Sequence, residues 1–131
     1  MAPPQTVLLV DTHEDSRAIY RIILEHHGFA VLLAARCAEA PTVARERRPD
    51  LVILELGLTR EHALDALRAL RGHAATAEVP VVALGTGFSA AERELALAAG
   101  FDAYLLKPLP PLELLEAARG LLDGRTRRAA G

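Results

Sequence analysis

The feature that most constrains this chain is a continuous apolar run over residues 51–54, Leu-Val-Ile-Leu, which ends in Glu55. Pro49 precedes the run and Gly57 follows it. A short apolar run without polar alternation is typical of a central strand buried on both faces, as in a parallel sheet covered by helices. Ligands of such α/β sheets bind beyond the carboxyl ends of the strands. We therefore expect Glu55 to lie where this architecture places its chemistry.

Apolar runs alternate with helical patterns along the rest of the chain. The expected strands cover residues 7–10, 29–33, 51–54, 80–84 and 103–106, and the expected helices cover 14–27, 38–47, 63–71, 90–99 and 110–122. This alternation indicates parallel strands joined by right-handed crossovers, with helices on both faces of the sheet. Residues 123–131 show no apolar period, so we expect one domain over residues 6–122 followed by a flexible basic tail or linker stub.

The composition excludes several classes of protein. A chain of 131 residues that is 51% hydrophobic fits one compact domain. Its formal net charge of −2 gives no reason to expect a nucleic-acid partner. No apolar run approaches the ~20 residues that a membrane-spanning helix needs. Cys37 is the only cysteine, so no internal disulfide forms, and we expect a surface or half-buried thiol in a cytoplasmic protein without a membrane partner.

Acidic and basic residues follow the expected strands in a specific order. Asp11 ends the first strand, Glu55 ends the third, and Lys107-Pro108 follows the fifth. The segments 49–52 (Pro-Asp-Leu-Val) and 98–104 (Ala-Ala-Gly-Phe-Asp-Ala-Tyr) lie between them in matching register. This set resembles a bacterial response-regulator receiver domain of the chemotaxis-regulator type, over about residues 6–122. The resemblance implies a flavodoxin-like, doubly wound (βα)5 three-layer sandwich with sheet order 2-1-3-4-5 and a pocket between strands one and three.

The resemblance also implies a chemistry. In that family, an aspartate after strand three accepts a phosphoryl group from a histidine kinase, and two acids after strand one help to hold Mg²⁺. A serine or threonine after strand four and a lysine after strand five contact the phosphoryl oxygens. Metal, lysine and hydroxyl together neutralise the charge of the transferred group. The implied pocket consists of Asp11, Thr12, Glu55, Gly57, Gly85, Thr86 and Lys107.

Three positions of this pocket depart from the family pattern. Thr12 stands in place of the second acid, which removes a charge that would hold the metal. Glu55 replaces the phosphoacceptor aspartate and carries its carboxylate up to ~1.5 Å further. Gly85 offers no hydroxyl, and Thr86, the next residue on an extended chain, points the other way. We therefore expect Mg²⁺ at Asp11 and Glu55 to be weakly bound or absent, and no other cofactor.

Three hypotheses for the function follow. The first is an atypical receiver, not an enzyme, that acts without phosphorylation by binding a histidine kinase, a downstream effector or itself. Glu55 then either mimics a phosphoaspartate in part, paired with Lys107, or is a tolerated acid in an inert pocket; a carboxylate has one charge against nearly two for a phosphate. The second hypothesis is a working phosphoacceptor with weak Mg²⁺-dependent transfer. The third is a small-ligand sensor that uses the altered pocket.

Two further features leave alternatives open. In the family, the aromatic residue of strand five swings in concert with the hydroxyl residue, so Tyr104 is either a switch residue or a half-buried aromatic at the sheet edge. The elements at 90–99, 103–106 and 110–122 form the face through which we expect any homodimer. His13 and His62 are expected on loops at the pocket rim, where they are either solvated or part of a metal site with Asp11 and Glu55, although their spacing in the sequence is not that of metal ligands.

Overall fold

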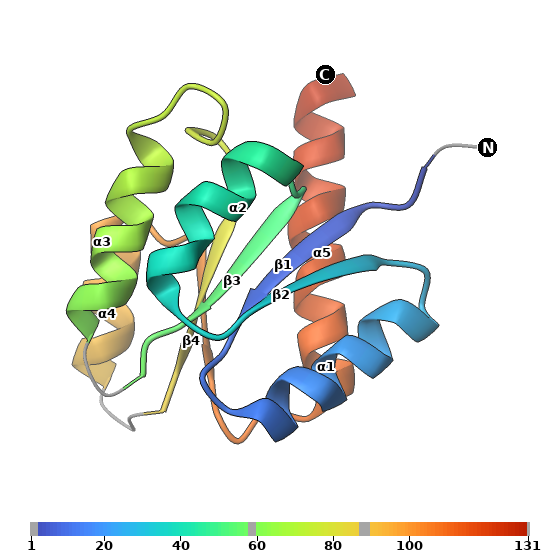
Figure 1. The fold of residues 1–131 in the computed structure, drawn as a ribbon, viewed down its shortest axis with the longest axis horizontal. Helices are drawn as coiled ribbons and strands as arrows, with labels where there is room; N and C mark the ends of the chain where they lie inside the picture. Colours follow the sequence, from blue (N-terminus) through green and yellow to red (C-terminus); the bar gives the residue numbers. More distant parts are fainter. Residues whose placement is uncertain (1–2, 58–59, 87–89, 131) are drawn as a thin grey trace.

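The structure is a computed structural model that describes residues 3–57, 60–86 and 90–130, the last six of them by their backbone alone. Its centre is a five-stranded parallel sheet of order β2-β1-β3-β4-β5 (Figure 1). The strands are β1 (Thr6–Val10), β2 (Ala30–Ala34), β3 (Leu51–Glu55), β4 (Val81–Gly85) and β5 (Ala103–Leu106). The predicted flavodoxin-like architecture and strand order are thereby confirmed.

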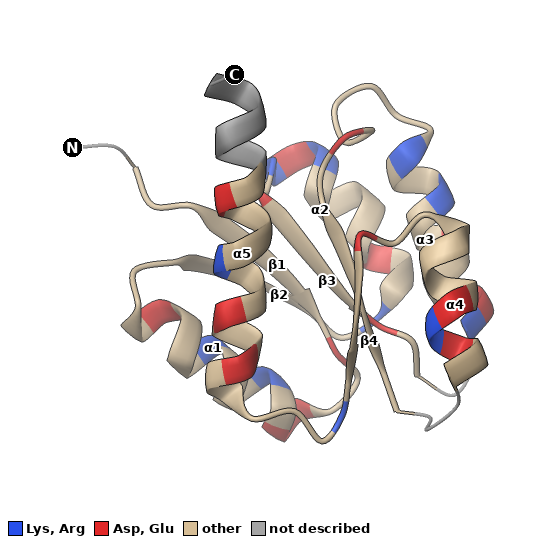
Figure 2. Ribbon diagram, turned by 180° about the vertical axis from the view of Figure 1, so that it is seen from behind, with Lys and Arg blue, Asp and Glu red and all other residues tan. Residues whose placement is uncertain are grey.

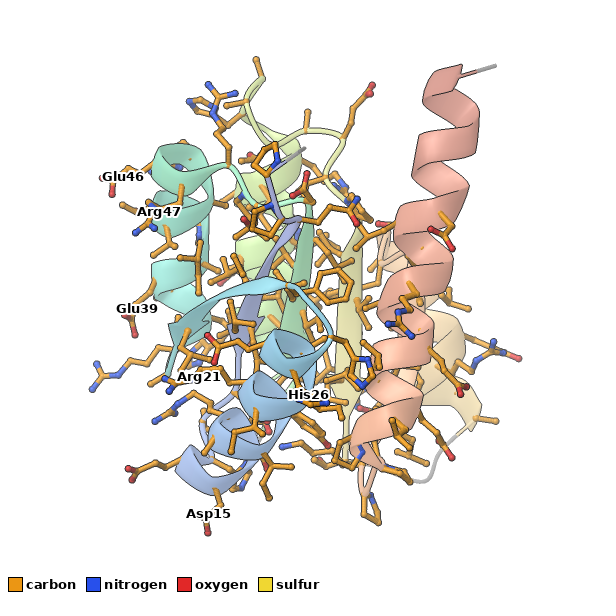
Figure 3. All side chains as sticks on the ribbon, turned by 90° about the vertical axis from the view of Figure 1, so that its right-hand side faces the viewer. Asp15, Arg21, His26, Glu39, Glu46 and Arg47 are labelled. Atoms are coloured by element: carbon orange, nitrogen blue, oxygen red, sulfur yellow. The ribbon has the colours of Figure 1, made fainter. Side chains whose placement is uncertain are left out.

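Helices cover both faces of the sheet, which gives three layers (Figure 1). They are α1 (Glu14–His26), the 3-10 helix η1 (Cys37–Glu39), α2 (Ala40–Arg47), α3 (Arg60–Arg71), α4 (Ala90–Ala99) and α5 (Pro111–Ala130). Apolar residues of α1 and α5 pack on one face, and those of α2, α3 and α4 pack on the other. On α1, Asp15 and Arg21 lie on the outside of the molecule (Figure 3). The helices are therefore amphipathic, with their apolar sides on the sheet.

The strand register brings the functional positions to one edge of the sheet. β3 is buried along its whole length, and Leu54 pairs with Val10 of β1 while Glu55 pairs with Leu84 of β4. On the far side of β4, Lys107 donates its backbone N–H to the carbonyl oxygen of Gly85 at 2.8 Å. Because all five strands run in parallel, the residues that follow β1, β3, β4 and β5 lie beside one another at their carboxyl ends.

Two local predictions are wrong. The last helix was expected to end at residue 122, whereas helix α5 continues to Ala130. Several arginines and alanines follow Leu122, and both are good helix formers, so the helix continues where the apolar period stops; one glycine does not end a helix. His62 lies in the first turn of α3 and not in a loop, because that helix begins at Arg60, before its first buried residue.

No helix within the described residues combines the length and apolar character needed to cross a bilayer. In the view of Figure 2, acidic and basic residues alternate over the outer helices. That view shows no concentrated basic face of the kind that nucleic-acid binding requires.

Candidate functional site

The centre of the site is an ion cluster in which one lysine bridges two buried acids. Asp11 is fully buried and Glu55 is 3% exposed, at the ends of β1 and β3. Lys107 Nζ lies 2.6 Å from Asp11 Oδ2 and 2.6 Å from Glu55 Oε2. It also donates to Ser16 Oγ at 3.3 Å. The predicted Glu55–Lys107 pair is present, and Asp11 belongs to the same cluster.

Thr12 holds the second oxygen of the Glu55 carboxylate. Its hydroxyl donates to Glu55 Oε1 at 2.6 Å, and its backbone N–H approaches the same atom at 3.3 Å. The longer glutamate side chain reaches this donor beyond β1, because it carries one carbon more than aspartate. Thr12, which replaces an acidic metal ligand of the family, therefore acts as a hydrogen-bond donor to Glu55.

His13 closes the cluster on its solvent side. Its Nδ1 atom lies 3.2 Å from Asp11 Oδ1 and 3.1 Å from Glu55 Oε2, while the side chain remains 64% exposed. The backbone N–H of His13 donates to Asp11 Oδ1 at 2.8 Å, and Arg17 Nη1 donates to the Asp11 carbonyl oxygen at 2.7 Å. The predicted rim position of His13 is correct, whereas the contacts of Ser16 and Arg17 have no signature in the sequence beyond their place in the first turn of α1.

The pKa values of the cluster follow from these contacts. Burial alone would raise the pKa of Glu55, but hydrogen bonds with Asp11, Lys107, Thr12 and His13 lower it to about 2. Burial, with the neighbouring Glu55, raises the pKa of Asp11. Burial opposes the charge on Lys107, but its hydrogen bonds with Asp11 and Glu55 outweigh this and raise its pKa. Glu55 is thus held as a carboxylate and Lys107 as an ammonium ion.

The β4–β5 side of the pocket is filled by an aromatic ring. A Cβ atom added to Gly85 would lie 2.6 Å from Cζ and 2.7 Å from Cε2 of Tyr104. The half-buried Tyr104 ring therefore occupies the space where the side chain of a serine or threonine at this position would begin. Burial, followed by the nearby Glu92 carboxylate, raises the pKa of its phenol. Thr86, one residue further on, is exposed and does not replace the missing hydroxyl.

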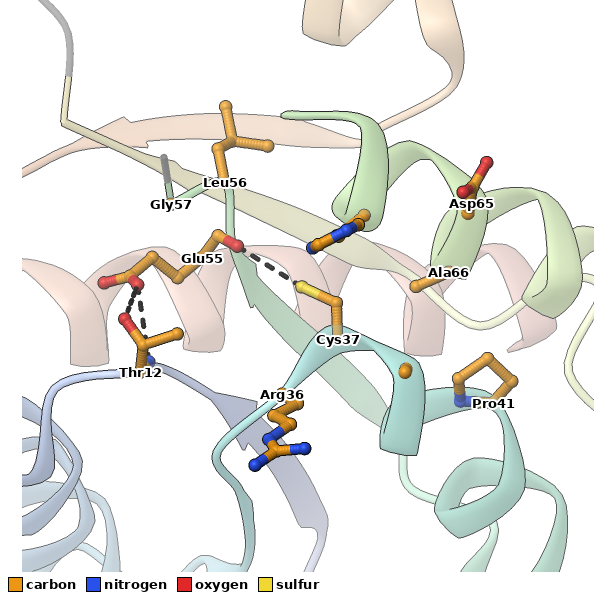
Figure 4. A pocket seen from close by; sticks show the side chains of 11 residues that line it. Thr12, Arg36, Cys37, Pro41, Glu55, Leu56, Gly57, Asp65 and Ala66 are labelled. Carbon is orange, nitrogen blue, oxygen red and sulfur yellow. Dashed lines mark hydrogen bonds between the residues drawn. The ribbon is translucent and has the colours of Figure 1, made fainter. Parts of the chain in front are cut away.

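A cavity of about 620 Å³ opens beside the cluster, between η1 and α3 (Figure 4). Glu55 and Thr12 of the cluster are among its lining residues, as are Gly57, Arg36 and His62. Cys37 Sγ donates to the Glu55 carbonyl oxygen at 3.5 Å, and burial raises the pKa of this thiol to about 11. Cys37 is therefore an inert part of the wall, neither a nucleophile nor a thiolate ligand at neutral pH.

The donor set does not suit Mg²⁺, the ion that the resemblance implies. Mg²⁺ requires near-octahedral oxygen coordination. Within the described residues, two carboxylates face the site, the hydroxyl of Thr12 is directed at Glu55, and the third side chain within reach is the imidazole of His13. Among the described side chains, the site offers Mg²⁺ one carboxylate fewer than the family pattern and an imidazole nitrogen in its place.

The fold and the site together define a doubly wound α/β protein with an acid–lysine pocket at the point where the strand order reverses. The family model of the response regulator receiver domain matches residues 7–119. The DNA-binding response regulator MtrA of Mycolicibacterium paratuberculosis is 35% identical over 118 residues, which cover 90% of this chain and 51% of that protein. The polar-differentiation response regulator DivK of Brucella anthropi is 25% identical over 91% of this chain and 97% of that protein.

Solved structures agree with this result. A response regulator from Desulfuromonas acetoxidans matches with a TM-score of 0.83 and 28% identity, over 91% of this chain and 97% of that one. The chemotaxis response regulator CheY4 of Vibrio cholerae matches with a TM-score of 0.81 and 26% identity, over 88% and 97%. The chain belongs to the response regulator receiver domain family, which serves two-component signalling. It spans about half the length of MtrA and its curated counterparts in other mycobacteria.

Proposed function

We propose that this receiver domain signals without phosphorylation of residue 55 and has no enzymatic activity of its own. The observation that carries the proposal is the saturation of the Glu55 carboxylate. Oε1 accepts the Thr12 hydroxyl, and Oε2 accepts Lys107 Nζ, each at 2.6 Å. A carboxylate that attacks a phosphoryl donor must give up such contacts and needs a metal to offset the incoming charge. Here the metal ligands are incomplete and the contacts are already made.

The contacts of Glu55 are in part those of a phosphorylated aspartate. Lys107 pairs with it, as a lysine pairs with a phosphoryl oxygen, and on the other side of the pocket Tyr104 lies over Gly85. A single carboxylate carries one charge against nearly two for a phosphate, so the imitation is incomplete. We infer that the chain is held in one signalling state by its own side chains.

The output of such a domain is a protein–protein contact. The helices α4 and α5, which flank β5, carry the exposed apolar side chains Leu95 (60% exposed) and Leu112 (57% exposed). We propose that this face binds a histidine kinase, a downstream effector or a second copy of the chain in the cytoplasm. MtrA is a DNA-binding regulator, but the match covers about half of it, and we propose no nucleic-acid contact for the domain described here.

An NMR titration with beryllofluoride and Mg²⁺ tests the proposal. We expect the amide resonances of residues 11–13, 55–57 and 105–107 to stay in place. The matched control is the triple variant Thr12→Asp, Glu55→Asp, Gly85→Thr, which restores the family residues and is expected to respond. Shifts of the unaltered chain comparable to those of the triple variant would overturn the proposal.

The cavity beside Glu55 favours a second candidate function, a small-ligand sensor. Its volume of about 620 Å³ lies within the range of ligand pockets, and Arg36 provides a cation among its lining residues. A metabolite screen by thermal shift, without phosphodonor, tests this function, since a ligand at 100 times its Kd stabilises the fold by ~2.7 kcal/mol. A hit is specific only if Ala38→Trp, which narrows the cavity from an exposed position on η1, abolishes the shift.

A further inference from the structure

Two buried acids and one exposed histidine of the ion cluster have the arrangement of metal ligands. Asp11, His13 and Glu55 each offer one ligand atom, and these atoms lie within 4.8 Å of one another. The Nδ1 atom of His13 lies 3.2 Å from Asp11 Oδ1 and 3.1 Å from Glu55 Oε2. Ligand atoms ~2.0–2.1 Å from one ion are ~3.0 Å apart in an octahedral site and ~3.3 Å apart in a tetrahedral one. The two observed separations fall between these values.

We propose that Asp11, His13 and Glu55 form a binding site for a borderline divalent metal ion, with Zn²⁺ as its best-fitting occupant, in place of the Mg²⁺ of the family. An imidazole nitrogen suits Zn²⁺ and related transition metals, whereas Mg²⁺ selects oxygen ligands alone. Three protein ligands with solvent at the fourth position is a common zinc arrangement. The exposed ring of His13 leaves that fourth position open to water.

The charge of the cluster also favours a cation at this place. The cluster holds two acids, Asp11 and Glu55, against one cation, Lys107, so with both acids ionised and the imidazole neutral it carries one negative charge that a metal ion can offset. Lys107 Nζ donates to Asp11 Oδ2 and to Glu55 Oε2, each at 2.6 Å, which leaves Asp11 Oδ1 directed at His13 and a second lone pair on Glu55 Oε2 for a metal ion. A metal ion replaces the hydrogen bonds that His13 now makes to the two acids, without removing Lys107.

Neighbouring groups hold the ligands in position before any ion arrives. The backbone N–H of His13 fixes Asp11 Oδ1 at 2.8 Å, and the hydroxyl of Thr12 fixes Glu55 Oε1 at 2.6 Å. Such partners of metal ligands typically change metal affinity by ~10–100-fold when removed. Thr12, which stands where the family has a second acid for Mg²⁺, thus holds the Glu55 carboxylate in place for the proposed site. The proposal is independent of the signalling mode, since a metal ion can bind whether or not residue 55 accepts a phosphoryl group.

Isothermal titration calorimetry of the intact, untagged chain with ZnCl₂ and with MgCl₂ tests the proposal. We expect one Zn²⁺ per chain, bound more tightly than Mg²⁺, and a loss of affinity of at least about tenfold in His13→Gln. The matched control is His62→Gln, which removes a histidine of the adjacent cavity outside the ligand set and is expected to bind as the unaltered chain does. Circular dichroism establishes that both variants are folded.

A second readout identifies the ligand directly. In ¹H–¹⁵N spectra of the histidine rings, Zn²⁺ is expected to shift His13 and to leave the neighbouring pair His26 and His27 unchanged. Equal Zn²⁺ affinity of His13→Gln and the unaltered chain, an equal loss in His62→Gln, or Mg²⁺ binding as tight as that of Zn²⁺ would each overturn the proposal. Zinc shifts confined to His26 and His27 would do so as well.

Discussion

The two sides of the pocket are stabilised by different interactions, ion pairs on one side and packing on the other. On the β1–β3 side, Asp11, Glu55 and Lys107 form a buried ion cluster in which every contact is electrostatic. On the β4–β5 side, Tyr104 fills the space over Gly85 by packing. In the family pattern, both sides respond to one phosphoryl group, through the lysine and through the hydroxyl residue. In this chain, Lys107 satisfies the acids on one side and Tyr104 fills the space on the other, with no phosphoryl group to link them. Substitutions can therefore disrupt the ion cluster and the packing contact independently.

Removal of the lysine is expected to have the largest effect. Lys107→Met leaves Asp11 and Glu55 as uncompensated buried acids, and the loss of one partner from a buried pair typically costs ~3–5 kcal/mol of unfolding free energy. Urea denaturation measures the change. The exposed pair of Arg68 with Asp65 is the control, since Arg68→Ala should leave stability nearly unchanged. Equal stabilities of the two variants would show that the cluster is not structural.

A side chain added on the packed side is expected to have the next largest effect. Gly85→Ala forces its Cβ atom into the Tyr104 ring, and overpacking of this kind costs ~1–3 kcal/mol. The control is Gly120→Ala, whose Cβ atom would have no neighbour within 4 Å and which should be neutral or slightly stabilising. In Tyr104→Leu the cost of Gly85→Ala should fall, and a double-mutant cycle measures this coupling. No coupling between the two positions would contradict the packing described above.

A smaller loss is expected for Thr12→Val, which keeps the shape of the side chain but removes the hydroxyl donor to Glu55. The loss of this hydrogen bond should cost ~1 kcal/mol and raise the pKa of Glu55 from about 2 toward its ordinary value. Carbon-13 NMR of the carboxylate follows the titration. Thr42→Val on the surface of α2 is the control. A Glu55 pKa that stays the same in Thr12→Val would show that Lys107 alone holds the carboxylate.

The smallest effect is a pH dependence at His13. Hydrogen bonding to Glu55, the charge of that carboxylate, and hydrogen bonding to Asp11 raise the pKa of the imidazole above its ordinary 6.5. Because the folded-state pKa is the higher one, charged His13 stabilises the fold fully below the unfolded pKa, and this contribution is lost as pH rises through the folded pKa. NMR titration should give a lower His13 pKa in Glu55→Gln. An unchanged value would contradict the proximity of the two groups.

The sequence was sufficient to predict the parts of the site that the sheet positions. Asp11, Glu55 and Lys107 follow buried parallel strands, and the register of such strands brings their ends together whatever the loops do. The contacts of Thr12 and His13 were not predictable in this way, because the direction of a side chain after a strand end depends on local torsions that leave no periodic pattern. His13 was recognised as a rim residue, but its contact with both acids needed the folded chain.

The extension of α5 shows a different limit. Buried apolar residues reveal a helix only where it packs on the sheet, and the last helix continues beyond Leu122, the last buried residue among those of its side chains that the structure describes. Past that point only the helix propensity of arginine and alanine indicates structure. We expected a flexible tail there because the segment after Leu122 has no apolar period from which a helix can be predicted.

The intact mass of the chain after incubation with acetyl phosphate and Mg²⁺ tests the central claim most directly. Glu55 already accepts Thr12 and Lys107, so we expect no added phosphoryl group, whereas the triple variant Thr12→Asp, Glu55→Asp, Gly85→Thr should gain one. A gain of one phosphoryl group by the unaltered chain that disappears in Glu55→Gln would contradict a phosphorylation-independent receiver.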